Sequence, residues 1–133
     1  MSYEQRDIYG IYKIKGKKGP GPELMGANTL TGEHVHNKQD VHLGDIKEFM
    51  LDMRTGKVAY AVMSFGGVFS VGEKLFAVPF AAMTLDTVKK VFVLDVDKER
   101  FEAAPGFDSN DWPDMADSTW TEAVHDYYGI SRH

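Results

Sequence analysis

The fold is decided by residues 51–67, which read LDMRTGKVAYAVMSFGG. Arg54-Thr55-Gly56 is typical of a three-residue hairpin loop, in which Gly56 takes the left-handed conformation. The strand that we expect next, residues 57–65, is apolar on both of its faces. A strand of this kind is covered on both sides, so it belongs in the centre of the protein, and Gly66-Gly67 ends it.

The strand predicted before this loop, residues 43–53, has an irregular apolar pattern. Its anchors are Ile46, Phe49 and Leu51. Ile46 and Phe49 are an odd number of residues apart, so they cannot share one face of a regular strand. One extra residue near Lys47-Glu48, a β-bulge, would turn all three anchors inward and bend the strand, as small barrels require.

Short strands and turns continue on both sides of this hairpin. The further strands predicted are residues 24–30, 33–37, 75–78 and 91–96. With the hairpin they make six short strands, which predicts an all-β fold, a small six-strand antiparallel β-barrel. Two Gly-Pro pairs within residues 19–22 separate the first strand from the N-terminal segment.

The C-terminal part is expected to be helical. Asp97 is a suitable N-cap for a short helix that stops before Pro105-Gly106. Asp117 can cap a second helix over residues 118–128, with Gly129 just past its end. The second helix carries one apolar stripe, made of Trp120, Ala123, Val124, Tyr127 and Tyr128.

Charge is distributed unevenly along the 133 residues, whose formal net charge is −5. Residues 1–22 carry five basic and two acidic side chains, a net +3, whereas residues 95–126 carry two basic and ten acidic side chains, a net −8. An acidic second half is repelled by phosphate backbones, so we do not expect nucleic acid to be the main partner. The N-terminal lysines leave two interpretations open, a solvated flexible arm and an RNA contact: Lys13, Lys15, Lys17 and Lys18.

Composition excludes several classes of site and location. The chain has no cysteine, which excludes disulfides, thiolate nucleophiles and Cys-ligated metal sites. No stretch approaches the ~20 apolar residues of a membrane helix, and the first six residues lack the apolar core of a signal peptide. We therefore expect a cytoplasmic protein that does not insert into membranes.

A series of motifs occurs in order along the chain. They are Gly44-Asp45-Ile46-Lys47-Glu48, residues 52–62, Ser64-Phe65-Gly66-Gly67, residues 71–79, residues 92–96 and residues 104–113. Together they resemble the PRC-barrel family. The resemblance implies a PRC-like barrel over residues 23–96, between a flexible basic N-terminal arm (1–22) and an acidic helical C-terminal extension (97–133).

The resemblance also implies a class of function. The family includes the cytoplasmic domain of the photosynthetic reaction-centre H subunit and the C-terminal domain of a ribosome-maturation factor, and both use the barrel to dock proteins. It implies no catalytic residue and no cofactor for this chain. We therefore expect a non-enzymatic protein-interaction or scaffold module, and the alternative is a ribosome- or RNA-associated factor that uses the basic arm.

The histidines are the candidates for metal binding. His34 and His36 fall on one face of a predicted strand and His42 follows shortly after, an arrangement compatible with metal binding. No carboxylate or second ligand pair at a recognised spacing accompanies them. We therefore expect solvent-facing histidines and no metal.

The candidate docking residues are Val68, Phe69 and Val71, in an apolar loop bounded by glycines. This loop either tucks against the end of the barrel or docks a partner, and the sequence leaves both open. The candidates for self-association are the aromatic residues of the C-terminal extension: Phe107, Trp112, Trp120, Tyr127 and Tyr128. They predict a homodimer, and the alternative is an extension that wraps its own barrel.

Overall fold

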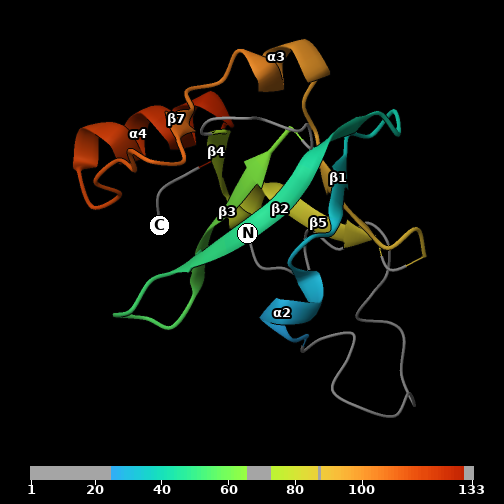
Figure 1. The fold of residues 1–133 in the computed structure, drawn as a ribbon, viewed down its shortest axis with the longest axis horizontal. Helices are drawn as coiled ribbons and strands as arrows, with labels where there is room; N and C mark the ends of the chain where they lie inside the picture. Colours follow the sequence, from blue (N-terminus) through green and yellow to red (C-terminus); the bar gives the residue numbers. More distant parts are fainter. Residues whose placement is uncertain (1–24, 66–72, 87, 131–133) are drawn as a thin grey trace.

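The computed structural model describes residues 25–65, 73–86 and 88–130. In these residues seven strands form one sheet, and short helices lie around it (Figure 1). The strands are β1 (His34–His36), β2 (His42–Leu51), β3 (Val58–Ser64), β4 (Lys74–Pro79), β5 (Met83–Asp86), β6 (Val91–Leu94) and β7 (Phe107–Asp108). The helices are α2 (Ala27–Leu30), the 3-10 helix η2 (Phe80–Ala82), α3 (Lys98–Glu102) and α4 (Ser118–Tyr127).

The sheet has the order β5-β6-β1-β2-β3-β4-β7. This confirms the all-β fold with a C-terminal helical extension, with three differences of detail. Five of the six predicted strands are present, the short strands β5 and β7 bring the total to seven, and the sheet stays open between these two ends. One pair, β1 with β6, is parallel because the chain reaches β6 through a long crossover, whereas the other pairs are antiparallel.

The β-bulge in β2 is confirmed, since the pairing of β2 with β3 shifts register between Ile46 and Glu48. Ile46 is fully buried and Phe49 packs against the core. The prediction that Leu51 also points inward is wrong, because its side chain is 54% exposed. A second register shift between Met50 and Leu51 turns the end of the strand away from the core.

The hairpin loop between β2 and β3 has the predicted form. The backbone N–H of Asp52 donates to the carbonyl of Lys57 over 2.8 Å, and Gly56 has a φ of 76°. Only glycine takes this conformation without strain, which is why Gly56 stands here. The hairpin extends away from the rest of the sheet (Figure 1).

β3 is covered on both faces, as its sequence predicts. One face contributes Ala61 and Met63 to the main core, and the other contributes Tyr60 to a smaller apolar cluster with Val124 of α4. The main core also contains Val35, Leu43, Phe76, Val78, Met83, Leu85, Phe92 and Leu94. Six strands therefore supply one core, so the sheet curves around it.

The strand predicted over residues 24–30 is wrong, because Ala27–Leu30 forms the single helical turn α2. The N–H and the hydroxyl of Thr31 both donate to the carbonyl of Ala27. Leu30 packs against the core while the preceding residues stay exposed. One turn of helix buries this single apolar anchor, whereas a strand would need a partner along its length.

The predicted C-terminal helices are present as α3 and α4. Asp117 caps α4, where its carboxylate accepts from the N–H of Thr119 over 2.9 Å, and Gly129 follows the helix with a φ of 68°. Asp97 stands at the N-cap of α3 as predicted, but its side chain makes no capping hydrogen bond. Among the described residues, no helix has the length and apolar character needed to cross a membrane.

Candidate functional site

A cluster of polar side chains lies where β1 and β2 pair. We name it the histidine cluster, and its members are His34, His36, Asp40, His42 and Asp45. In the antiparallel register His34 is opposite Asp45, and His36 is opposite His42. A register shift beside His36 leaves one extra residue in β2, so His42 and Asp45 share a face although they are three positions apart.

Two imidazoles contact one carboxylate oxygen in this cluster. Nδ1 of His34 lies 2.5 Å from Oδ1 of Asp45, and Nε2 of His42 lies 3.0 Å from the same oxygen. The rings of His34 and His42 meet edge to face with their centroids 4.8 Å apart. Each ring can therefore donate a hydrogen bond to Asp45, so the three side chains converge on one point.

The second carboxylate of the cluster belongs to Asp40. Nδ1 of His36 lies 2.9 Å from Oδ1 of Asp40, and the ammonium of Lys89 lies 3.7 Å from the same oxygen. The hydrogen bond with His36 and the charge of Lys89 lower the pKa of Asp40 below its ordinary value. The His36–Asp40 pair lies beside Asp45 but shares no atom with the contacts that Asp45 makes to His34 and His42.

Asp45 is the more enclosed of the two carboxylates. Partial burial by itself would raise the pKa of Asp45, but the hydrogen bonds from His34 and His42 outweigh it and hold the pKa below its ordinary value. Asp45 is therefore ionised at neutral pH, which makes it an acceptor for both rings.

His34 and His42 face solvent, as the sequence predicts, whereas His36 is more enclosed, with a side chain that is 23% exposed. The side chain of His34 is 60% exposed and that of His42 is 45% exposed. In the sequence no carboxylate accompanies them at a recognised spacing, but the fold places Asp45 between the rings of His34 and His42. In a regular strand, residues three positions apart lie on opposite faces, so the spacing of Asp45 from His42 does not predict a contact. The bulge brings the two residues to one face.

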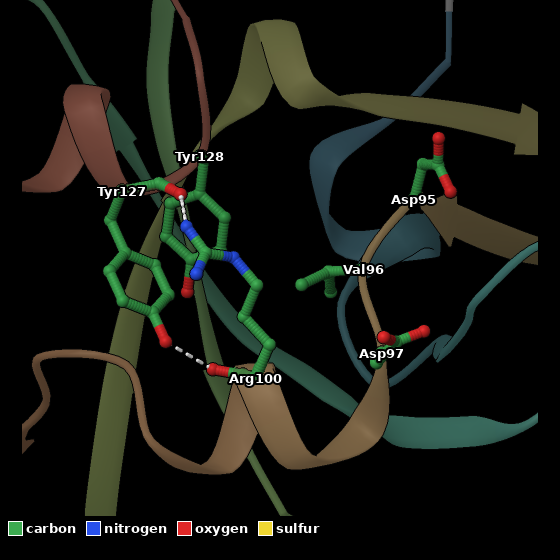
Figure 2. A pocket seen from close by; sticks show the side chains of 6 residues that line it. All are labelled: Asp95, Val96, Asp97, Arg100, Tyr127 and Tyr128. Atoms are coloured by element: carbon green, nitrogen blue, oxygen red, sulfur yellow. Dashed lines mark hydrogen bonds between the residues drawn. The ribbon is translucent and has the colours of Figure 1, made fainter.

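A pocket of about 280 Å³ lies between α3 and the end of α4 (Figure 2). Arg100 and Tyr127 hold its wall together, since Nη2 of Arg100 donates to the carbonyl of Tyr127 over 2.7 Å and the hydroxyl of Tyr127 donates to the carbonyl of Arg100 over 2.5 Å. The guanidinium of Arg100 also lies over the ring of Tyr127, at 4.2 Å from its centroid. These reciprocal contacts fasten the C-terminal extension to α3.

The predicted docking loop, with Val68, Phe69 and Val71, lies outside the described residues. So do Lys13, Lys15, Lys17 and Lys18 of the predicted basic arm.

The five aromatic residues predicted for self-association all make contacts within their own chain. The rings of Phe107 and Trp112 lie 5.0 Å apart, and Trp120 lies 5.3 Å from Tyr60 of β3. Tyr127 and Tyr128 contact each other with their centroids 5.3 Å apart. The contact of Trp120 with Tyr60 fits the alternative of an extension that wraps its own barrel, whereas the other two contacts lie within the extension. Trp112 stays 39% exposed.

The far end of the β2–β3 hairpin is a surface feature that the sequence alone did not predict. Met53 is 86% exposed there, next to the exposed Leu51. β1 reaches β2 only as far as Ile46, so among the described residues the outer edge of β2 beyond Ile46 has no strand partner. We name this region, residues 47–53, the hairpin end.

The curved sheet, its single core and its C-terminal helices define a small β-sheet domain. Residues 22–101, more than half of the chain, match the family model of the PRC-barrel domain. The chain therefore belongs to the PRC-barrel family, which confirms the resemblance of its motifs. No curated protein gives a match to this chain.

Proposed function

We propose that this chain is a non-enzymatic protein-interaction module that docks its partner at the hairpin end. The observation that carries the proposal is the pair of exposed apolar side chains, Leu51 and Met53, on a projecting hairpin. Exposure of apolar side chains to water is unfavourable. Their burial by a partner stabilises the complex by roughly 25 cal/mol for each Å² of apolar surface covered.

The backbone of the hairpin end supports the same proposal. An unpaired strand edge presents a row of N–H and C=O groups to which an extended segment of another protein can add as a further strand. We expect the main-chain bonds to supply affinity, while Leu51 and Met53 supply specificity by entering an apolar recess of the partner.

The experiment is affinity capture from the cells in which the chain occurs, compared across matched variants by quantitative mass spectrometry. The double variant Leu51→Asp with Met53→Asp should lose a protein that the wild type retains. Val88→Asp is the control, because Val88 is 87% exposed on a different turn. All variants should melt within a few degrees of the wild type, since none of these side chains is in the core.

The outcomes separate the function from its location. A protein that is lost only from Phe69→Asp would move the docking site to the loop with Val68 and Val71 and overturn the assignment to the hairpin end. Capture of the same proteins by every variant would contradict the assignment to the hairpin end, and capture of no protein by the wild type would contradict the interaction function itself. A partner that disappears with ribonuclease, or on deletion of residues 1–22, would favour the RNA-associated alternative.

Self-association stays a prediction, and it now depends mainly on Trp112, the most exposed of the five C-terminal aromatics. Light scattering behind a sizing column measures it directly. A mass of two chains that falls to one in Trp112→Asp would support a dimer through the extension. A mass of ~15 kDa across micromolar concentrations would overturn it.

A further inference from the structure

We propose that His34, His42 and Asp45 form a binding site for a divalent transition-metal ion, of which Zn²⁺ is the first candidate. The potential ligand atoms are one imidazole nitrogen of each histidine and one carboxylate oxygen. All three lie within 4.8 Å of one another. This site is independent of the docking function proposed for the hairpin end.

The spacing of these atoms suits one ion with small adjustments. Ligands at ~2.0–2.2 Å from a tetrahedral ion stand roughly 3.3–3.6 Å from one another. The two contacts to Asp45 are 2.5 and 3.0 Å, so both must lengthen, and the two imidazole nitrogens, which lie within 4.8 Å of each other, must approach for one ion to contact all three atoms. The exposed side chains have the freedom to make this movement.

The donor set determines the class of metal. Two imidazoles and one carboxylate suit Zn²⁺, Ni²⁺, Co²⁺ and Cu²⁺, whereas Mg²⁺ and Ca²⁺ prefer oxygen ligands throughout. The ionised carboxylate of Asp45 would neutralise part of the ionic charge. Three protein ligands leave a fourth position that faces solvent, because His34 and His42 are both largely exposed.

The backbone positions of the ligands are fixed by the fold. His34 and Asp45 are direct cross-strand partners, and the register shift in the β1–β2 pair turns His42 to the same face. Val35 and Leu43, which neighbour the ligands in sequence, are buried in the main core. Ligands carried on anchored strands lose little conformational entropy when an ion binds.

The test is titration of the untagged full-length chain with ZnCl₂ in a calorimeter, with Co²⁺ as a spectroscopic probe. We expect one Zn²⁺ per chain in the wild type. His34→Gln, His42→Gln and Asp45→Asn should each weaken binding by about tenfold or more, since each removes one of three ligands. Co²⁺ should give visible absorption bands of a low-coordination site that are lost in the same variants.

His36→Gln is the matched control, because His36 is in the histidine cluster but pairs with Asp40 instead of Asp45. We expect it to bind Zn²⁺ within about threefold of the wild type. Thermal melting of the metal-free variants checks that each one is folded, and the exposed positions make this the expected result. Absence of stoichiometric binding in the wild type, or equal losses in His36→Gln and the ligand variants, would overturn the proposed site.

Discussion

Gly44 lies at a close approach of β2 to β3. A methyl group in place of its hydrogen would overlap the carbonyl oxygen of Ser64, a backbone atom that cannot move without breaking the sheet. We therefore expect Gly44→Ala to lower the free energy of unfolding by about 1–3 kcal/mol, the usual cost of overpacking. Urea denaturation measures the change.

Gly26 provides the control for this prediction. A methyl group at Gly26 would have its nearest neighbour, Oγ1 of Thr29, at an ordinary contact distance of 3.4 Å. Gly26→Ala should therefore cost less than Gly44→Ala. Equal losses in the two variants would show that the close approach of Gly44 to Ser64 is not the cause.

Tyr128 carries a buried hydroxyl that has no hydrogen-bond partner within the described part of the chain. Burial raises the pKa of this hydroxyl above its ordinary value. Because the buried group gives no hydrogen bond in return for its lost hydration, we expect Tyr128→Phe to leave the free energy of unfolding unchanged or to raise it by up to about 1 kcal/mol.

Tyr127→Phe is the matched comparison for Tyr128→Phe. It removes the hydroxyl that donates to the carbonyl of Arg100, so we expect a loss of about 0.5–1.5 kcal/mol. Both variants are measured by chemical denaturation. A greater loss in Tyr128→Phe than in Tyr127→Phe would mean that the hydroxyl of Tyr128 has a partner.

Among the elements, α4 has a defined start that can be tested. The carboxylate of Asp117 accepts from the N–H of Thr119, whereas Asp97 at the start of α3 makes no such bond. We expect Asp117→Ala to lower the free energy of unfolding by about 0.5–2 kcal/mol, and Asp97→Ala to have a smaller effect. Thermal denaturation compares the two, and a larger effect of Asp97→Ala would contradict this assignment of the caps.

Elements with a strong local signal could be predicted from the sequence. The hairpin loop is determined by Gly56 and its neighbours. β3 is predicted by a run that is apolar on both faces, which is typical of a strand covered on both sides. α2 and β5 could not, because each has only four residues and is defined by its contacts with other elements. α2 buries Leu30 against the core, and β5 pairs with β6 across a turn in which Asp86 accepts from the N–H groups of Val88 and Lys89.

The candidate site was predictable only in part, for the same reason. His34 and His36 alternate along a strand, so their common face follows from the sequence. The carboxylate of Asp45 meets His34 and His42 through a cross-strand register and a bulge. Neither is visible in the linear spacing, because a change of one residue in register reverses the face of every following side chain.

At the scale of the whole molecule, the C-terminal extension covers one part of the sheet and leaves another part uncovered. The C-terminal extension packs on β3 and β4, where most of its aromatic side chains are at least partly buried. The hairpin end extends beyond this covered region with its apolar side chains in solvent. The proposed docking function therefore depends on the hairpin end being the surface that meets another protein.

Photo-crosslinking in the cells in which the chain occurs tests this claim most directly. A photoreactive amino acid replaces Met53 in one protein and Val88 in another, two side chains of nearly equal exposure on different turns. If the hairpin end docks another protein, we expect a specific crosslink to that protein from position 53 and none from position 88. The same crosslinks from both positions, or a crosslink from position 88 alone, would contradict it.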